Sequence, residues 1–169
     1  MPRSKNWSPM SPQRGDNKRI NAMSTQAIIE IKFSDNGTLC MVEVLRDGHL
    51  VELTKVITKA LAKADNDGQR DRLNWGILAS KVVGEVIGKY DKAAIISAEY
   101  YDEARKNTCA NGIEIHPVAS TYISKNNNIL DSVFIKGSEY GKHAFYCSAS
   151  EANANAKKFK TEQAKQDQI

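Results

Sequence analysis

The sequence contains no long hydrophobic run, and cysteine is scarce. A transmembrane helix needs about 20 consecutive apolar residues, and no segment of this chain approaches that length. The three cysteines, Cys40, Cys109 and Cys147, are odd in number and far apart. That pattern disfavours a disulfide framework and is typical of a reducing compartment. We therefore expect a cytoplasmic protein with no membrane contact and no secretory signal.

Motifs for catalysis and cofactor binding are also lacking. Gly76, Gly84 and Gly88 complete neither G-x-G-x-x-G nor G-x-x-x-x-G-K-[ST], so the sequence has no phosphate-binding loop. The acidic residues are scattered, and spacing alone pairs none of them for acid–base chemistry. These absences favour a non-enzymatic protein without a cofactor.

Positive charge is concentrated at the N-terminus. The formal net charge of the chain is +4. Residues 1–22 contain a single acidic residue, Asp16, and the basic residues Arg3, Lys5, Arg14, Lys18 and Arg19, so the rest of the chain is balanced. Residues 1–24 also hold most of the prolines and show no apolar periodicity. Such a segment cannot bury enough surface to offset its ordering entropy, and we predict a disordered basic tail over 1–24.

The first half of the remaining chain predicts a β-hairpin followed by two helices. Residues 27–33 and 39–45 are apolar segments joined by a turn with an Asn-Gly pair, as in a tight hairpin. Residues 49–64 have one apolar stripe with helical spacing, and residues 70–89 have another, Leu73, Ile77, Ser80, Val83, Ile87 and Tyr90. We expect an αα-hairpin that covers a sheet, with Gly76, Gly84 and Gly88 allowing the close approach of a neighbouring element.

The second half returns to strand patterns. Residues 92–106 fit either a helix or, over 93–98, a buried strand, and we favour a third helix. Strands are expected over 113–118, 120–123, 129–135 and 142–148. The fold class is therefore α+β, with an N-terminal hairpin, an αα-hairpin and a C-terminal antiparallel β-meander, and with the helices on one face of the sheet. We expect one domain over 25–149 and a polar, weakly helical or frayed tail over 150–169.

Nucleic acid is the first expected partner. The cations of the tail can hold phosphates while Trp7 stacks on a base. Lys55, Lys59 and Lys63 recur every four residues along one side of the first predicted helix and form a cationic stripe. The strand aromatics Tyr122, Phe134, Phe145 and Tyr146 offer either a stacking platform or ordinary core residues.

Four Cys and His residues provide a different interpretation. Cys109, His116, His143 and Cys147 are soft ligands of the number and type that suit tetrahedral zinc, but their spacing matches no usual zinc motif. A Cys–His nucleophile pair would need an orienting third group, which the sequence does not supply. We therefore predict no metal and treat these four residues as the candidates for a zinc protein or small hydrolase.

These observations favour a small accessory or regulatory protein that associates with nucleic acid through its basic tail. The abundance of Asn and Lys is typical of AT-rich genomes, including mobile elements. The alternatives are a protein-binding inhibitor or adaptor that acts on a host enzyme, and a Cys/His-dependent hydrolase or zinc protein. The exposed edges of the hairpin also make homodimerisation an expected way to cover them.

Overall fold

The computed structural model describes residues 25–33, 37–66, 72–97, 109–117, 122–124 and 128–167. The predicted basic tail over 1–24, with Arg3, Lys5, Trp7, Arg14, Lys18 and Arg19, lies outside them. Within the described part of the chain, no helix is both long enough and apolar enough to cross a membrane.

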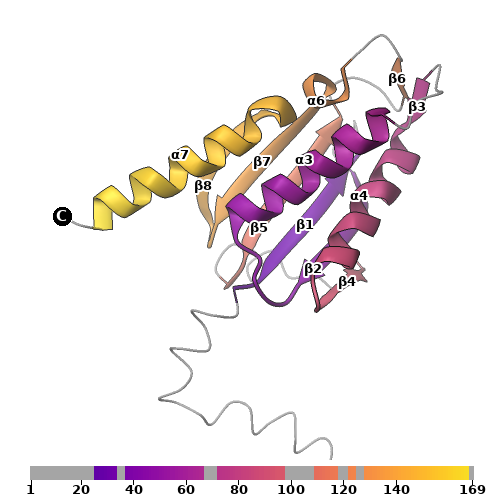
Figure 1. Ribbon diagram of the computed structural model, residues 1–169. Coiled ribbons are helices and arrows are strands. Elements are labelled where there is room, and N and C mark those ends of the chain that lie inside the picture. Colours follow the sequence, from indigo (N-terminus) through magenta and orange to yellow (C-terminus); the bar gives the residue numbers. More distant parts are fainter. Residues whose placement is uncertain are drawn as a thin grey trace, which may run out of the picture.

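A mixed six-stranded sheet forms the centre of the molecule (Figure 1). Its strand order is β4-β2-β1-β5-β7-β8. The strands are β1 (Ala27–Lys32), β2 (Thr38–Val44), β4 (Ala93–Ile96), β5 (Asn111–Pro117), β7 (Val133–Glu139) and β8 (Lys142–Ser148). β1 and β5 are parallel, and every other neighbouring pair in this sheet is antiparallel. A separate ribbon pairs β3 (Arg72–Asn74) with β6 (Tyr122–Ser124).

Three long helices cover one face of this sheet, as Figure 1 shows. They are α3 (Leu50–Asn66), α4 (Trp75–Lys89) and α7 (Ala149–Asp167), and a single turn, α6 (Ile129–Ser132), precedes β7. Side chains alternate across each strand, so Ile29 and Ile31 of β1 join the core beneath the helices. The predicted α+β class, with an N-terminal hairpin, a C-terminal meander and helices on one face, is confirmed.

The apolar stripe predicted for residues 49–64 is the buried face of α3. Leu50, Leu53, Ile57, Leu61 and Ala64 are all in the main core. Lys55, Lys59 and Lys63 are exposed on the other side of this helix, because a stripe that recurs every three to four residues places the intervening positions in solvent.

The stripe predicted for the second helix was largely assigned to the wrong face. α4 begins at Trp75, and it buries Trp75, Leu78, Ala79, Val82 and Val86. Ile77 and Ile87, which we expected to be buried, are 52% and 37% exposed. Both sides of this segment are apolar, so periodicity alone does not choose between them. The core takes the side that carries Trp75, whose Nε1 donates a hydrogen bond to the Lys32 carbonyl at 2.7 Å.

We also expected the glycines of α4 to let a neighbouring element approach closely, and this prediction is wrong for Gly84 and Gly88. A Cβ built at Gly84 or Gly88 would meet no atom within 4 Å. These two glycines lie away from the core, and the packing of this chain gives no reason for them.

Three further segments differ from the sequence prediction. Residues 93–96 form strand β4, which pairs with the edge of β2, whereas we favoured a helix; the rest of that predicted helix, from residue 98, lies outside the described residues. Residues 129–132 form a helical turn capped by the Asn128 side chain, which accepts a hydrogen bond from the Leu130 amide, so the strand starts only at Val133.

The C-terminal segment, for which we expected a weakly helical or frayed tail, is the 19-residue helix α7. Ala149, Ala152 and Ala156 are buried against the rest of the core. Small side chains allow the helix to approach closely, and the Asn153 amide donates a hydrogen bond to the Thr58 hydroxyl of α3 at 3.0 Å. α7 is therefore packed as a part of the same unit as the sheet.

Candidate functional site on the sheet face opposite the helices

The sheet face opposite the helices carries polar and aromatic side chains where β1, β5, β7 and β8 run side by side. Two copies of the pattern Ile-Glu-Ile-basic place the polar ones: residues 29–32 in β1 and residues 113–116 in β5. The two strands are parallel and in register, so Glu30 lies beside Glu114. The isoleucines of both copies face the core, and the period of two directs the Glu and basic side chains to the opposite face.

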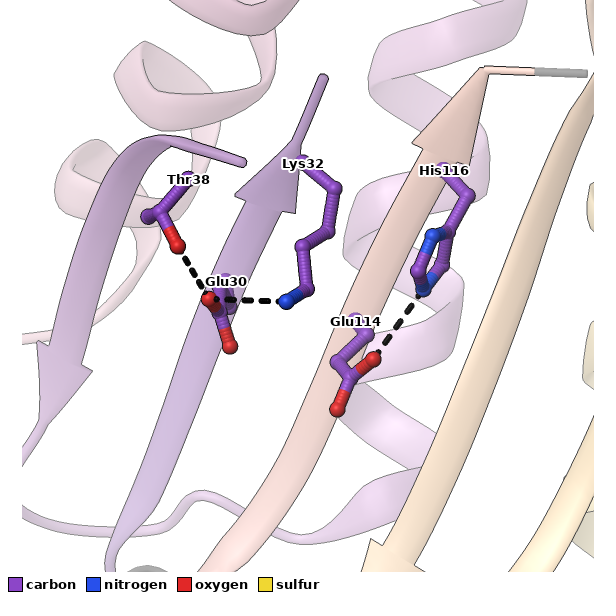
Figure 2. Close-up of polar contacts among 5 residues, drawn as sticks. All are labelled: Glu30, Lys32, Thr38, Glu114 and His116. Carbon is purple, nitrogen blue, oxygen red and sulfur yellow. Dashed lines mark hydrogen bonds and ion pairs between the residues drawn. The ribbon is translucent and has the colours of Figure 1, made fainter. Parts of the chain in front are cut away.

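Each glutamate has a basic partner two residues later on its own strand (Figure 2). Lys32 Nζ lies 3.2 Å from Glu30 Oε2, and Thr38 of β2 donates a hydrogen bond to the same oxygen. His116 Nε2 lies 3.0 Å from Glu114 Oε1. Figure 2 shows these five side chains on one face of the strands, with the helices behind.

The partners allow two carboxylates to lie on neighbouring strands. Adjacent strands are about 4.8 Å apart, so unpaired carboxylates at matched positions repel each other. Lys32 offsets the charge of Glu30, which is only 7% exposed, and the His116 ring forms a hydrogen bond with the Glu114 carboxylate. We call Glu30, Lys32, Thr38, Glu114 and His116 the polar cluster.

Aromatic rings adjoin the polar cluster. The ring centroids of His116 and Tyr146 are 6.0 Å apart, and those of Phe134 and Tyr146 are 5.8 Å apart with the planes at 76°. The three rings come from the adjacent strands β5, β7 and β8. Their separations are those of favourable tilted and edge-to-face contacts. We call His116, Phe134 and Tyr146 the aromatic face.

Lys136 completes this surface. On β7 it is paired with Glu114 on one side and with Tyr146 on the other, and it is exposed. An exposed cation beside aromatic rings can attract an anion while the rings bind a flat apolar group. The surface therefore combines ring faces, two lysines and the partly exposed Glu114 carboxylate, whereas Glu30 beside it is buried.

Of the predicted aromatic residues, Phe134 and Tyr146 lie on this surface and Phe145 does not. Phe145 is in the core beneath the helices, and the side chain of Tyr122 lies outside what the structure describes. Glu30, Lys32, Glu114 and Lys136 were missed by the sequence analysis. The repeated Ile-Glu-Ile-basic pattern was the signal that could have found the first three.

The cationic stripe of α3 is on the other side of the molecule from the aromatic face, because α3 covers the opposite face of the sheet. Lys55 lies 3.8 Å from Glu52, and Lys63 lies 3.9 Å from Glu85. Such exposed ion pairs contribute little to stability. Lys55, Lys59 and Lys63 are therefore not part of the same surface as the aromatic face.

The four Cys and His candidates do not come together. Cys147 is paired with Ile135 on the core side, whereas His116 is on the opposite face of the sheet. A register shift in the β7–β8 pair places His143 opposite Ser138, which pairs with Gly112. Gly112 is four residues from His116, or about 13 Å along the strand. Among the residues that the structure describes, no group of three or more His, Cys, Asp or Glu could hold a metal ion.

The environments of Cys147 and Cys40 do not activate these two thiols. Burial raises the pKa of Cys147 above its ordinary value, although a hydrogen bond with Asn155 acts in the opposite direction. Burial also raises the pKa of Cys40. Because the thiolate is the nucleophile and the metal ligand, a raised pKa makes both thiols less reactive at neutral pH.

A groove lies elsewhere, between α4 and the edge of the sheet. It has a volume of about 420 Å³ and a mostly apolar lining, formed by Leu39, Cys40, Gly76, Ala79, Ser80, Val83, Gly84 and Ile95. Nothing in the structure identifies another protein that would cover it, so the adaptor function stays a prediction.

No protein-family model, curated protein or solved structure matches this chain.

Proposed function

We propose that this protein binds single-stranded nucleic acid on the aromatic face, as a non-enzymatic accessory or regulatory protein. The observation that carries the proposal is the meeting of three rings from three adjacent strands on a sheet face that none of the described helices covers. Unpaired bases stack on exposed aromatic side chains of sheets, and a ring is worth about 1–3 kcal/mol per base.

The charges near the rings are consistent with this partner. Lys32 and Lys136 lie within one or two strands of the rings and can contact phosphates. The basic tail, Arg3 to Arg19, adds sequence-independent attraction through the release of counterions. In this proposal the α3 stripe of Lys55, Lys59 and Lys63, on the opposite side, adds only salt-sensitive contacts to longer strands.

The proposal is tested by removing the rings one at a time. Binding of a fluorescein-labelled 12-nucleotide strand, DNA or RNA, is measured by fluorescence anisotropy at 50 mM salt. Tyr146→Ala and Phe134→Ala should each weaken binding by roughly 5- to 150-fold, the equivalent of one stacked base. Tyr146→Phe should bind as the wild type does, because it retains the ring.

Tyr140→Ala is the matched control. Tyr140 is also exposed but lies in the β7–β8 turn, away from the ring cluster, so its loss should leave the affinity unchanged. The proposal fails if the wild-type chain binds neither DNA nor RNA at this salt concentration, or if the Phe134 and Tyr146 variants bind as tightly as the Tyr140 variant.

A further inference from the structure

We infer that the exposed side of α4 is an interface between two copies of this chain, packed as an antiparallel helix pair around a two-fold axis near Val83. This inference is independent of the proposed function, because α4 lies on the other side of the sheet from the aromatic face. A dimer of this kind leaves the aromatic face of each copy outside the interface.

The side of α4 that points away from the core is apolar, as the buried side is. Ile77 is 52% exposed and Ile87 is 37% exposed. Ser80 is exposed on the same side, but its hydroxyl donates a hydrogen bond to the Gly76 carbonyl of its own helix at 2.9 Å. Helices with apolar residues on both sides are typically buried on both sides. The exposed side of α4 therefore has the composition of an interface.

This side of α4 is also complementary to itself. A two-fold interface uses the same surface twice, so that surface must carry both members of each contact. When the axis passes near Val83, residues at equal distances before and after it lie opposite each other. Ile77 is then close to Gly88 of the second copy, where a Cβ would meet no atom of its own chain within 4 Å. Ile87 is close to Ser80 of the second copy, which lines the apolar groove beside α4.

The charges of α4 fit the same axis. Lys81 is two residues before Val83 and Glu85 is two residues after it, and residues four apart lie on the same side of a helix. The antiparallel arrangement therefore places each Lys81 beside the Glu85 of the second copy. Glu85 is accessible to this contact, because its side chain is 41% exposed and the Lys63 ammonium, at 3.9 Å, is beyond hydrogen-bond distance. This charge complementarity identifies a second copy as the partner.

The test measures the oligomeric state of the full-length, nuclease-treated protein by sedimentation equilibrium between about 5 and 200 μM. The wild-type protein should be in monomer–dimer equilibrium in this range. Lys81→Glu and Glu85→Lys should each weaken the dimer by roughly 5- to 50-fold, because each substitution places like charges together at two related positions. An equimolar mixture of these two variants should restore the wild-type affinity, since every contact in the mixed dimer again joins opposite charges.

Lys158→Glu is the matched control. It makes the same change of charge at an exposed position of α7, which α3 separates from α4 (Figure 1), so it should leave the dimer unchanged. Ile87→Ser tests the apolar contact and should weaken the dimer by roughly 10- to 150-fold, as expected when a buried isoleucine is lost. Circular dichroism of each variant verifies that it is folded.

Three results would overturn the inference. They are a wild-type protein that stays monomeric up to the highest concentration, an Ile87→Ser variant that dimerises as the wild type does, and a mixture of the Lys81 and Glu85 variants that associates no better than either alone. No nucleic acid is present in these measurements, so their failure leaves the proposed function untouched, and a failure to bind nucleic acid leaves the dimer untouched.

Discussion

Two glycines show how strongly the surroundings of a single Cα differ within this molecule. A Cβ at Gly137 would lie 2.5 Å and 2.6 Å from two ring atoms of Phe145, which is buried. A Cβ at Gly84 would meet nothing within 4 Å. The same residue type is therefore required on β7 by the ring on the next strand, and at Gly84 of α4 it only weakens the helix.

Gly137→Ala should lower the free energy of unfolding by about 1–3 kcal/mol, because the ring must move in a packed core. Gly84→Ala, the matched control, should raise it by up to about 1 kcal/mol, because alanine is the better helix residue and fits the open space. Urea denaturation monitored by circular dichroism measures both changes. A Gly137→Ala variant as stable as the wild type would contradict the close contact with Phe145.

Among the residues that the structure describes, none forms a hydrogen bond with the buried hydroxyl group of Tyr90. Burying a hydroxyl without a partner costs about 1–3 kcal/mol in protein mutational data. Tyr90→Phe should therefore leave the stability unchanged or raise it by about 1 kcal/mol at pH 7. A loss of stability greater than 1 kcal/mol in urea denaturation would mean that the hydroxyl has a partner after all.

The same group makes stability depend on alkaline pH. Burial, together with the carboxylates of Glu52 and Asp47, raises the pKa of Tyr90 from about 10 to about 12. The folded state thus keeps a proton that the unfolded state loses above pH 10, and the stability from this group is lost as the pH rises through about 12. The free energy of unfolding should fall less steeply between pH 9.5 and 11.5 in Tyr90→Phe than in the wild type. Parallel slopes would contradict the raised pKa.

At the scale of the elements, α7 is the largest departure from the sequence prediction. Its residues are mostly Ala, Asn, Lys and Gln, which indicate helix propensity but no apolar stripe. The buried residues of α7 are alanines. How much they stabilise the fold depends on how closely α3 and β8 approach this helix. The periodicity of apolar residues does not predict such packing, because alanine also occurs on exposed helix surfaces.

Substitutions at two alanines of α7 can distinguish the effect of its packing from the effect of helix propensity. Ala156 is fully buried, and Ala154, two residues earlier, is exposed. Ala156→Asp should destabilise the protein by about 3 kcal/mol or more, because it buries an unpaired charge. Ala154→Asp should cost less than about 1 kcal/mol, which is the loss of helix propensity alone. Similar urea midpoints for the two variants would show that α7 does not pack on the rest of the molecule.

At the scale of the whole molecule, the charge is divided between a basic N-terminal segment and a balanced remainder. Deleting residues 1–22 should therefore weaken binding to the labelled 12-nucleotide strand and flatten its dependence on salt, since fewer counterions are released. The losses caused by Phe134→Ala and Tyr146→Ala should persist in the shortened chain. An unchanged salt slope between 50 and 200 mM would mean that the tail makes no phosphate contacts.

Features that depend on the local order of residues along the chain can be predicted without the fold. The alternation in residues 27–33 and the single apolar stripe of residues 49–64 each led to the observed element, because neighbouring residues set the side-chain direction within a strand or helix. Local order did not identify the buried side of α4, because both sides of that segment are apolar. It also did not identify β4 as a strand, because that short segment fits either a helix or a strand.

Which distant residues contact one another depends on how the strands pair. The two Ile-Glu-Ile-basic segments lie far apart in the sequence, and they become neighbours because β5 pairs with β1 in parallel and in register. The same pairing of distant strands brings His116, Phe134 and Tyr146 together and separates His116 from Cys147. A period of two assigns each side chain to a face, but the partner of a strand and its register come from contacts between distant segments.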